Sequence, residues 1–121
     1  MLQVGLCDDE PVLLDTLEEK VRRCFSENLI FAEIQAFTGG QNLLYEAEDG
    51  KRFDLLLLDI EMPGMDGLEL ARCIREQNIP ARLVFLSAYS DFEYARKGIL
   101  YGADDYLVKP VRYQELVDLF T

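Results

Sequence analysis

The chain has 121 residues, half of them hydrophobic and 29% charged, which is the composition of a single globular domain large enough to bury its own core. Its 12 basic and 23 acidic residues give a net charge of −11, which argues against a nucleic-acid-binding domain and against attachment to an anionic membrane. It contains no histidine, which excludes catalysis by a histidine general base. Its three cysteines are widely spaced, which argues against a zinc site and a disulfide framework.

The apolar runs of the sequence give no sign of a membrane protein. Residues 1–4 lack the basic start and apolar core of a signal peptide, and no apolar run approaches membrane-spanning length. We therefore expect a cytoplasmic protein with no membrane partner. The acidic excess is uneven, because residues 1–79 hold 7 basic and 17 acidic side chains, whereas residues 82–113 hold 5 basic and 4 acidic. The second stretch should therefore repel a partner least.

The first third of the chain predicts a strand, a helix and a second strand. Residues 2–7 form an apolar run that ends at the acidic residues 8–10. Pro11 then fits the first turn of a helix whose apolar stripe continues to Phe25. In residues 29–37 polar side chains alternate with apolar ones. This second strand should therefore have one wet side and lie at an edge of its sheet.

A short helix over residues 42–48 leads to the most apolar part of the chain. Four consecutive leucines, Leu55–Leu58, fit a strand buried on both faces of a parallel sheet. The strand ends at Asp59, and Pro63-Gly64 then forces a turn. Asp66, with an acidic residue three positions on, is typical of the N-cap of a helix. The pattern therefore predicts that Asp59 is presented at a strand tip rather than buried.

The same alternation of helix and strand continues to the end of the chain. The elements predicted after the central strand are a helix with Leu70, Ala71 and Ile74 on its apolar face, a strand over residues 83–86 that ends at Ser87, a helix over residues 91–100, a strand over residues 104–108 that ends at Lys109-Pro110, and a helix with apolar residues from Tyr113 to Phe120. Five strands alternating with five helices predict an α/β fold with a parallel sheet.

Four strand tips carry polar groups: Asp8-Asp9, Asp59, Ser87 and Lys109. We expect these groups to form one site, because chemistry in open parallel sheets gathers at the carboxyl ends of the strands. Three carboxylates about 4 Å apart would repel one another by roughly 4 kcal/mol per pair at an effective dielectric constant of about 20. A hard divalent cation relieves that repulsion, and oxygen ligands without histidine or thiolate favour Mg²⁺.

A site of this composition is suited to phosphoryl transfer. Mg²⁺ held by few carboxylates completes its coordination with water and phosphate oxygens. A lysine and a hydroxyl facing it would stabilise the oxygens of a phosphoryl group in transfer. The Asp59 carboxylate is the one group positioned as a nucleophile, and its attack on phosphorus gives an aspartyl-phosphate.

Five motifs in a fixed order resemble the receiver domain of bacterial two-component response regulators over the whole chain, residues 1–121. The motifs are Asp8-Asp9, residues 58–63, residues 64–67, Ser87-Ala88 and residues 102–110. The resemblance implies a flavodoxin-like α/β fold with a five-stranded parallel sheet of order 2-1-3-4-5 and five helices on its two faces.

The resemblance also implies a metal site and an acceptor. Asp59 would accept the phosphoryl group from the phosphohistidine of a sensor histidine kinase. Asp9, Asp59 and the backbone carbonyl of Glu61 would ligate Mg²⁺ directly, with Asp8 acting through water.

Further residues of the family pattern bear on the phosphoryl group and on switching. Ser87 and Lys109 would contact the phosphoryl oxygens, and Tyr106 would turn with Ser87 when the state changes. The Lys109-Pro110 peptide bond would be cis. Glu61 and Tyr89 occupy positions that affect the lifetime of the phosphoryl group.

Two outputs follow from the resemblance. Residues 89–95 with residues 102–106 resemble receivers fused to AraC-type or LytTR-type DNA-binding domains, so this domain would regulate transcription and reach DNA only through an effector domain absent from the chain. A stand-alone receiver is the alternative. Five of the six tyrosines lie between Tyr89 and Tyr113, which predicts a phosphorylation-dependent homodimer through residues 89–113.

Three other classes of protein fit the residues less well. A haloacid-dehalogenase-type phosphatase needs a second Asp two residues after the nucleophile, where this chain has Glu61, and a cap insertion. A flavodoxin-like cofactor binder needs a first loop that cradles phosphate, which the acidic residues 8–10 would repel. A purely structural domain would not respond to Mg²⁺. We therefore expect a signalling module that catalyses only its own phosphorylation and dephosphorylation, not an enzyme.

Overall fold

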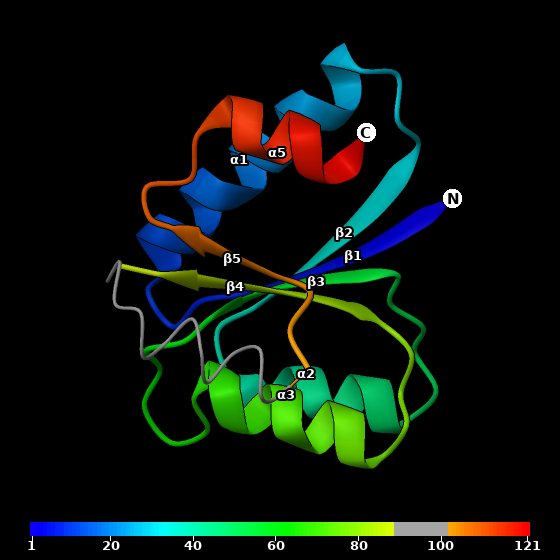
Figure 1. Ribbon diagram of the computed structural model, residues 1–121, viewed down its shortest axis with the longest axis vertical. Helices are drawn as coiled ribbons and strands as arrows, with labels where there is room; N and C mark the ends of the chain where they lie inside the picture. The colour runs from blue at the N-terminus through cyan, green and yellow to red at the C-terminus, as the bar shows by residue number, and fades with distance from the viewer. Residues whose placement is uncertain (89–101) are drawn as a thin grey trace.

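A parallel β-sheet forms the middle layer of the protein in the computed structural model, which describes residues 1–88 and 102–121 (Figure 1). Its five strands lie in the order β2-β1-β3-β4-β5, which confirms the predicted class and strand order. The strands are β1 (Leu2–Cys7), β2 (Ala32–Phe37), β3 (Leu55–Asp59), β4 (Arg82–Ser87) and β5 (Asp105–Val108).

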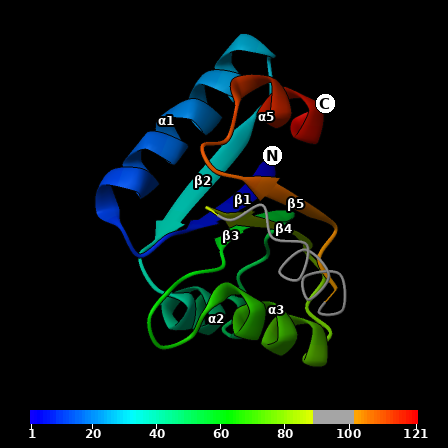
Figure 2. The same ribbon diagram turned by 60° about the vertical axis from the view of Figure 1, so that its left-hand side comes forward.

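Helices cover both faces of the sheet, with α1 and α5 on one face and α2 and α3 on the other (Figures 1 and 2). They are α1 (Pro11–Glu27), α2 (Gly40–Glu48), α3 (Gly67–Glu76) and α5 (Tyr113–Phe120). The described part of the chain thus contains four helices instead of the predicted five, because the helix predicted over residues 91–100 lies outside it. None of the four is long and apolar enough to cross a membrane.

The central strand β3 is buried along its whole length. Leu56 and Leu58 belong to the core cluster beneath α2 and α3, whereas Leu55 and Leu57 belong to the cluster beneath α1 and α5. Because successive side chains of a strand point to opposite faces, a leucine run without polar alternation fills both cores. Burial of one leucine side chain contributes about 1.5–3 kcal/mol, so this strand anchors the fold.

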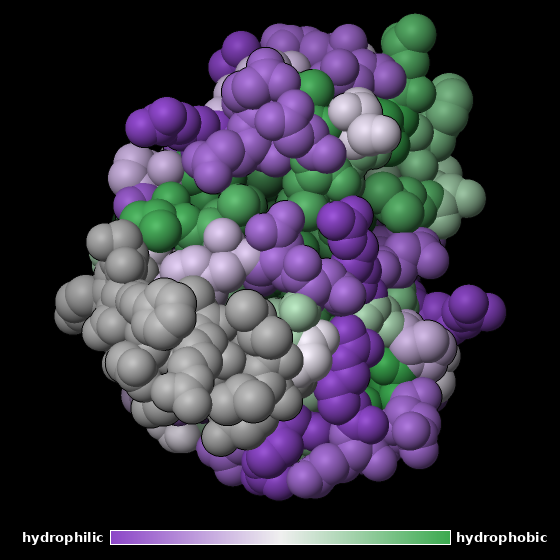
Figure 3. Space-filling view, viewed as in Figure 1, coloured by the Kyte–Doolittle hydropathy of each residue, from purple (hydrophilic) through white to green (hydrophobic). Residues whose placement is uncertain are grey.

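The second strand begins at Ala32, so the prediction of a strand from Leu29 was wrong. Leu29 has a positive φ of 55°, and the Ile30 amide donates a hydrogen bond to the Phe25 carbonyl, which closes the end of α1. This connection leaves Leu29 and Phe31 86% and 81% exposed. Apolar surface is visible at the upper right of Figure 3, on the side where α1 leads into β2.

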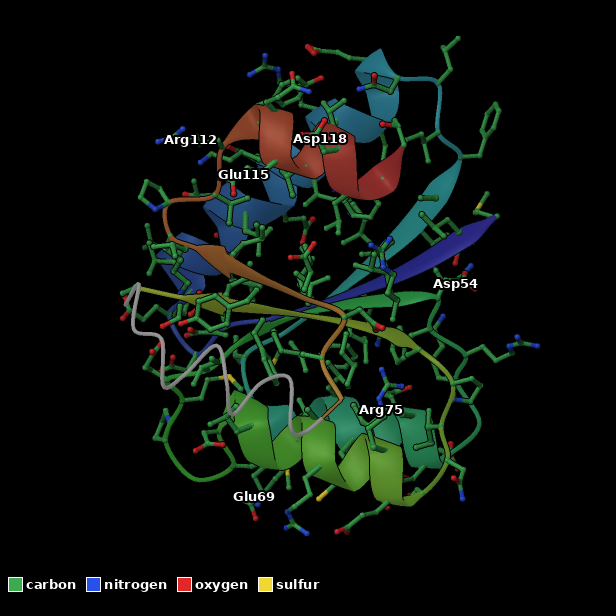
Figure 4. All side chains as sticks on the ribbon, viewed as in Figure 1. Asp54, Glu69, Arg75, Arg112, Glu115 and Asp118 are labelled. Carbon is green, nitrogen blue, oxygen red and sulfur yellow. The ribbon has the colours of Figure 1, made fainter. Side chains whose placement is uncertain are left out.

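Strand β5 begins at Asp105, one residue later than predicted, because Asp104 is used as an anchor. The Asp104 carboxylate accepts a hydrogen bond from the Leu83 amide at 2.8 Å and forms an ion pair with Arg75 at 3.3 Å. Arg75 projects from α3 and also donates to the Gly102 carbonyl at 2.9 Å (Figure 4). These contacts attach the start of β5 to α3.

The connection from β3 to α3 positions the end of β3. Asp66 caps α3 as predicted, because its carboxylate accepts a hydrogen bond from the Glu69 amide at 2.8 Å. The Gly67 amide donates to the Ile60 carbonyl at 3.0 Å. A Cβ atom at Gly67 would overlap the backbone carbonyl of Asp59, so only glycine fits here.

Candidate functional site

Three carboxylates meet at the carboxyl edge of the sheet. Asp8 and Asp9 follow β1, and Asp59 is the last residue of the neighbouring strand β3. One carboxylate oxygen from each lies within 4.8 Å of the others. The adjacency of β1 and β3 therefore brings together the three acids that the sequence assigned to one site.

Asp59 is buried, with 3% of its surface exposed, so the prediction that it is presented to solvent was wrong. The carboxylates of the cluster and Lys109 enclose its side chain. Burial raises the pKa of Asp59 to about 7; the charge of Lys109 opposes this shift, while the charges of Asp8 and Glu61 add to it. The strand-tip aspartate is therefore held in an environment that disfavours its ionised form.

Lys109 bridges two of the carboxylates. Its Nζ donates a hydrogen bond to Asp8 Oδ2 at 2.9 Å and lies 3.2 Å from Asp59 Oδ1 in an ion pair. Burial disfavours the charged ammonium, but the hydrogen bond to Asp8 and the charge of Asp59 outweigh it and raise the pKa of Lys109. The peptide bond between Lys109 and Pro110 is cis, as predicted. Lys109 supplies part of the positive charge that the carboxylate cluster requires.

The donor set also fits a hard cation. The Lys109 ion pair lacks the geometry of a hydrogen bond at Asp59 Oδ1, and this oxygen is buried with no hydrogen-bond partner among the described residues. Asp9 is half-buried, whereas Asp8 is 2% exposed and accepts a hydrogen bond from the Glu10 amide at 3.0 Å. A cluster of oxygen ligands with an unsatisfied carboxylate oxygen is suited to Mg²⁺.

Ser87 ends β4 beside this cluster, and its side chain is fully buried. Its hydroxyl donates a hydrogen bond to Glu61 Oε1 at 2.6 Å. The sequence analysis assigned Glu61 a backbone metal ligand and a position that affects the lifetime of the phosphoryl group, but it did not predict this contact of its side chain with Ser87. The signal was available, since Glu61 lies two residues beyond the tip of β3 and β4 is the next strand in the sheet.

Tyr106 lies two residues before the end of β5, whereas the other predicted site residues lie at or beyond the ends of their strands. It pairs with Phe85 in the register of β4 and β5, whereas Ser87 pairs with Val108. It is half-buried and packs against the core cluster beneath α2 and α3. Of the other tyrosines assigned to the predicted dimer face, Tyr89, Tyr94 and Tyr101 lie outside the described residues, whereas Tyr113 begins α5 and donates a hydrogen bond to Glu27 at 2.8 Å.

The three cysteines are free thiols, of which Cys7 and Cys24 are buried and Cys73 is half-buried. Cys7 lies directly before the acidic pair and donates a weak hydrogen bond to the Met62 sulfur at 3.6 Å. Burial, with the charges of Asp8 and Asp59, raises the pKa of Cys7 to about 12. The thiol therefore stays protonated and is no nucleophile at neutral pH.

A cavity of about 330 Å³ adjoins the carboxylate cluster between α1 and the segment that joins β5 to α5. Asp8 and Lys109 form part of its wall, which places it next to the cluster. The other lining residues are Leu13, Thr16, Leu17, Lys20, Leu86, Ala88, Pro110 and Val111. The site therefore has an apolar approach on the α1 side.

Comparison with known proteins gives a family and several relatives. The family described as "Response regulator receiver domain" matches residues 4–121. The two-component response regulator ARR18 of Arabidopsis thaliana is 36% identical over 119 residues, which are 98% of this chain and 18% of that protein. The uncharacterized transcriptional regulatory protein YesN of Bacillus subtilis is 32% identical over 117 residues, which are 97% of this chain and 31% of that protein.

These relatives limit what the similarity implies. The chain spans less than a third of the length of either one, and they come from a plant and a bacterium, so the predicted bacterial origin is not established. Among solved structures, the receiver domain of DrrB, described as activated with BeF3, superposes with a TM-score of 0.82 at 28% identity, covering 99% of this chain and 94% of that one. The same architecture and family-level sequence similarity therefore extend across the whole chain.

Proposed function

This chain belongs to the family of response regulator receiver domains of two-component systems, and from that premise we propose that it is a switch controlled by phosphorylation of Asp59. Such a domain is a phosphoacceptor signalling module rather than an enzyme with a separate substrate. The observation that carries the proposal is the Asp59 carboxylate itself, which is buried at the tip of β3, 3.2 Å from Lys109 and within 4.8 Å of two further carboxylates.

The proposed reaction transfers a phosphoryl group from a phosphohistidine to Asp59. A carboxylate oxygen of Asp59 forms the new O–P bond while the P–N bond breaks, and the electron pair of that bond returns to the imidazole of the donor. Lys109, which contacts both Asp8 and Asp59, is the proposed cation that neutralises charge on the transferred oxygens. Ser87, at the neighbouring strand tip, is the proposed hydrogen-bond donor to one of those oxygens.

Mg²⁺ is the proposed cofactor of this transfer. Asp9, Asp59 and the backbone carbonyl of Glu61 would hold it, with Asp8 acting through water. The acidic cluster supports this assignment, as does Asp59 Oδ1, which has no hydrogen-bond partner among the described residues. When bound, the cation supplies positive charge that favours ionised Asp59 and the phosphoryl oxygens.

The proposed partner is a sensor histidine kinase, because a receiver domain implies a phosphohistidine donor. Two apolar residues at the start of α1, Val12 and Leu13, are 76% and 42% exposed, and Leu13 also lines the cavity beside the cluster. This apolar surface supports an approach of the donor from the α1 side. Because the domain carries a net charge of −11, it would repel an acidic surface on the kinase. The contact is therefore proposed to be mainly apolar.

The proposed output is regulation of transcription through a C-terminal DNA-binding domain of a longer protein. Two observations support it: the curated relatives are several times longer than this chain, and one of them is described as a transcriptional regulatory protein. The net charge of −11 fits a domain that does not itself contact DNA.

The proposed function is tested by phosphorylation in solution. With Mg²⁺ and a small-molecule phosphodonor, the wild-type chain should gain the mass of one phosphoryl group, and peptide mass spectrometry should locate it on Asp59. Asp59→Asn should gain none, because it keeps the shape of the side chain and removes the nucleophile. Equal labelling of the Asp59→Asn variant would show that the acceptor lies elsewhere.

A further inference from the structure

The hydrogen bond from Ser87 to Glu61 is set by the backbone of the sheet. Asp59 pairs with Leu86 in the register of β3 and β4, and the Ile60 amide donates to the Leu86 carbonyl at 3.0 Å. The pairing thus continues beyond the tip of β3 and places Glu61 beside Ser87. The resulting contact, 2.6 Å between Ser87 Oγ and Glu61 Oε1, has the length of a charge-assisted hydrogen bond.

This hydrogen bond conflicts with the role proposed for Ser87 in the phosphorylated protein. A serine hydroxyl has a single hydrogen to donate. While that hydrogen is donated to the Glu61 carboxylate, it is not available to an oxygen of a phosphoryl group on Asp59. Both acceptors lie near Ser87, because Asp59 pairs with Leu86, the residue before Ser87, and Glu61 contacts the Ser87 hydroxyl directly.

We propose that Glu61 is a positioning residue that holds the Ser87 hydroxyl in the unphosphorylated protein and competes with the phosphoryl group for it. The inference rests on the proposed function, since it concerns how that same site is switched. Formation of the phosphorylated conformation then includes the exchange of one hydrogen-bond acceptor for another at Ser87. Glu61 thereby sets how favourable that conformation is.

The surroundings of Glu61 allow this exchange. Glu61 is half-buried, so its carboxylate can turn toward water once Ser87 is released. Lys109 is engaged with Asp8 and Asp59, and none of the ion pairs within residues 1–88 and 102–121 involves Glu61. Within that part of the chain, the hydroxyl of Ser87 is the hydrogen-bond donor that the structure gives to this carboxylate.

Binding of beryllofluoride with Mg²⁺, a mimic of the phosphoryl group, tests the proposal without any turnover. Protein-bound fluoride is measured by ¹⁹F NMR for wild type, Glu61→Ala, Ser87→Ala and the double variant. Removal of Glu61 should tighten binding about 10-fold more when Ser87 is present than when it is absent, which is the effect of one charge-assisted hydrogen bond. The comparison cancels any repulsion between Glu61 and the mimic that does not involve Ser87.

Two further variants distinguish positioning from a general effect of charge or folding. Glu61→Gln keeps an acceptor atom of the same reach, so it should retain part of the dependence on Ser87. Glu69→Ala removes an exposed carboxylate from the first turn of α3 (Figure 4) and should change the affinity less than about twofold, because it does not touch Ser87. Urea unfolding of each variant establishes that it is folded. If Glu61→Ala does not fold, Glu61→Gln replaces it in the comparison.

The outcomes separate the two proposals. Equal gains from Glu61→Ala with and without Ser87, in a protein that binds beryllofluoride normally, would overturn the role of Glu61 and leave the phosphorylation switch intact. Failure of wild type to bind beryllofluoride and to accept a phosphoryl group would overturn the proposed function, and the role of Glu61 with it.

Discussion

The candidate site joins one half-buried ammonium, that of Lys109, to a cluster of three carboxylates, two of which it contacts directly. With all groups ionised, two negative charges remain in excess, which is the charge of one divalent cation. The raised pKa of Asp59 shows the same imbalance, since burial and the neighbouring carboxylates outweigh the attraction of Lys109. At the scale of residues, the cluster of carboxylates that suits phosphoryl transfer therefore lowers the stability of the metal-free fold.

Asp59→Asn should stabilise the metal-free protein, and the gain should depend on pH. The pKa of Asp59 is about 7 in the folded chain and near its ordinary value of 3.8 when unfolded, so between these values the folded state binds more protons. The free energy of unfolding therefore falls as pH rises from about 4 to about 7. The pKa of about 7 already includes the attraction of Lys109. Above pH 7 the gain from Asp59→Asn should therefore be on the order of a few kcal/mol, and it should vanish near pH 4.

Urea unfolding in the presence of a chelator measures this gain across the pH range. Asp54→Asn is the control, because Asp54 lies at the opposite end of β3, where it accepts a hydrogen bond from the Gln3 amide. A gain from Asp59→Asn that is constant from pH 4 to pH 8 would contradict the raised pKa.

Asp9→Asn should remove repulsion and metal binding together. In chelator, the variant should be more stable than wild type by on the order of 1 kcal/mol, since one charge of the cluster is lost. Added Mg²⁺ should raise the melting temperature of wild type by mass action and that of the variant much less. Equal stabilisation of both proteins by Mg²⁺, measured by thermal unfolding, would mean that Asp9 is not a ligand.

At the scale of elements, the connection from β3 to α3 positions Asp59. Gly67 begins α3 directly against the Asp59 carbonyl, and the Asp66 cap fixes where the helix starts. Because helix and strand tip approach each other at backbone distance, a shift of α3 would move the acceptor residue itself. The same helix contacts the segment before the edge strand β5 through Arg75, which binds Gly102 and Asp104.

Gly67→Ala should therefore disrupt both the fold and the site. Its Cβ would overlap backbone atoms of Asp59, which cannot move aside as a flexible side chain would. We expect a loss of about 2–4 kcal/mol in the free energy of unfolding and a marked loss of phosphorylation. Gly39→Ala is the matched control, because a Cβ there has no contact closer than 4.0 Å, and it should cost less than about 1 kcal/mol. Similar urea midpoints for the two variants would show that the close approach at Gly67 has no energetic weight.

At the scale of the whole molecule, the net charge of −11 opposes self-association. The stretch from residue 82 to residue 113 is nearly balanced in charge, and its described part includes β4 and the edge strand β5. Val108 on β5 is 37% exposed, and Leu107 and Tyr106 are half-buried. This edge is therefore the part of the described surface where two copies would repel each other least.

We expect phosphorylation to strengthen homodimer formation through residues 89–113. The phosphoryl group would draw Ser87 toward it and allow Tyr106 to turn, and such a shift in population is limited to a few kcal/mol. Sedimentation with beryllofluoride and Mg²⁺ should show more dimer in wild type and little change in Ser87→Ala. Dimer formation should increase with ionic strength, because salt screens the repulsion. An unchanged monomer at high protein concentration would leave a different protein as the partner of this face.

The features that the sequence predicted best depend on local pattern and order. The leucine run predicted β3, Asp66 predicted the start of α3, and the alternation in residues 29–37 predicted an edge strand. The start of β2 was misplaced, because Leu29 is apolar and yet closes α1 with a positive φ, a conformation that a side-chain pattern does not reveal.

By itself, the sequence determined the parallel α/β architecture and which side chains lie at the strand tips, because periodicity and chain order decide both. Only the tertiary structure decided that Asp59 is buried and that Lys109 bridges it to Asp8, since the environment of a charge depends on groups distant in sequence. The hydrogen bond between Glu61 and Ser87 was likewise decided by the register of β3 and β4. A side chain's type states what it can donate or accept, but the packing of neighbouring strands determines which partner it meets.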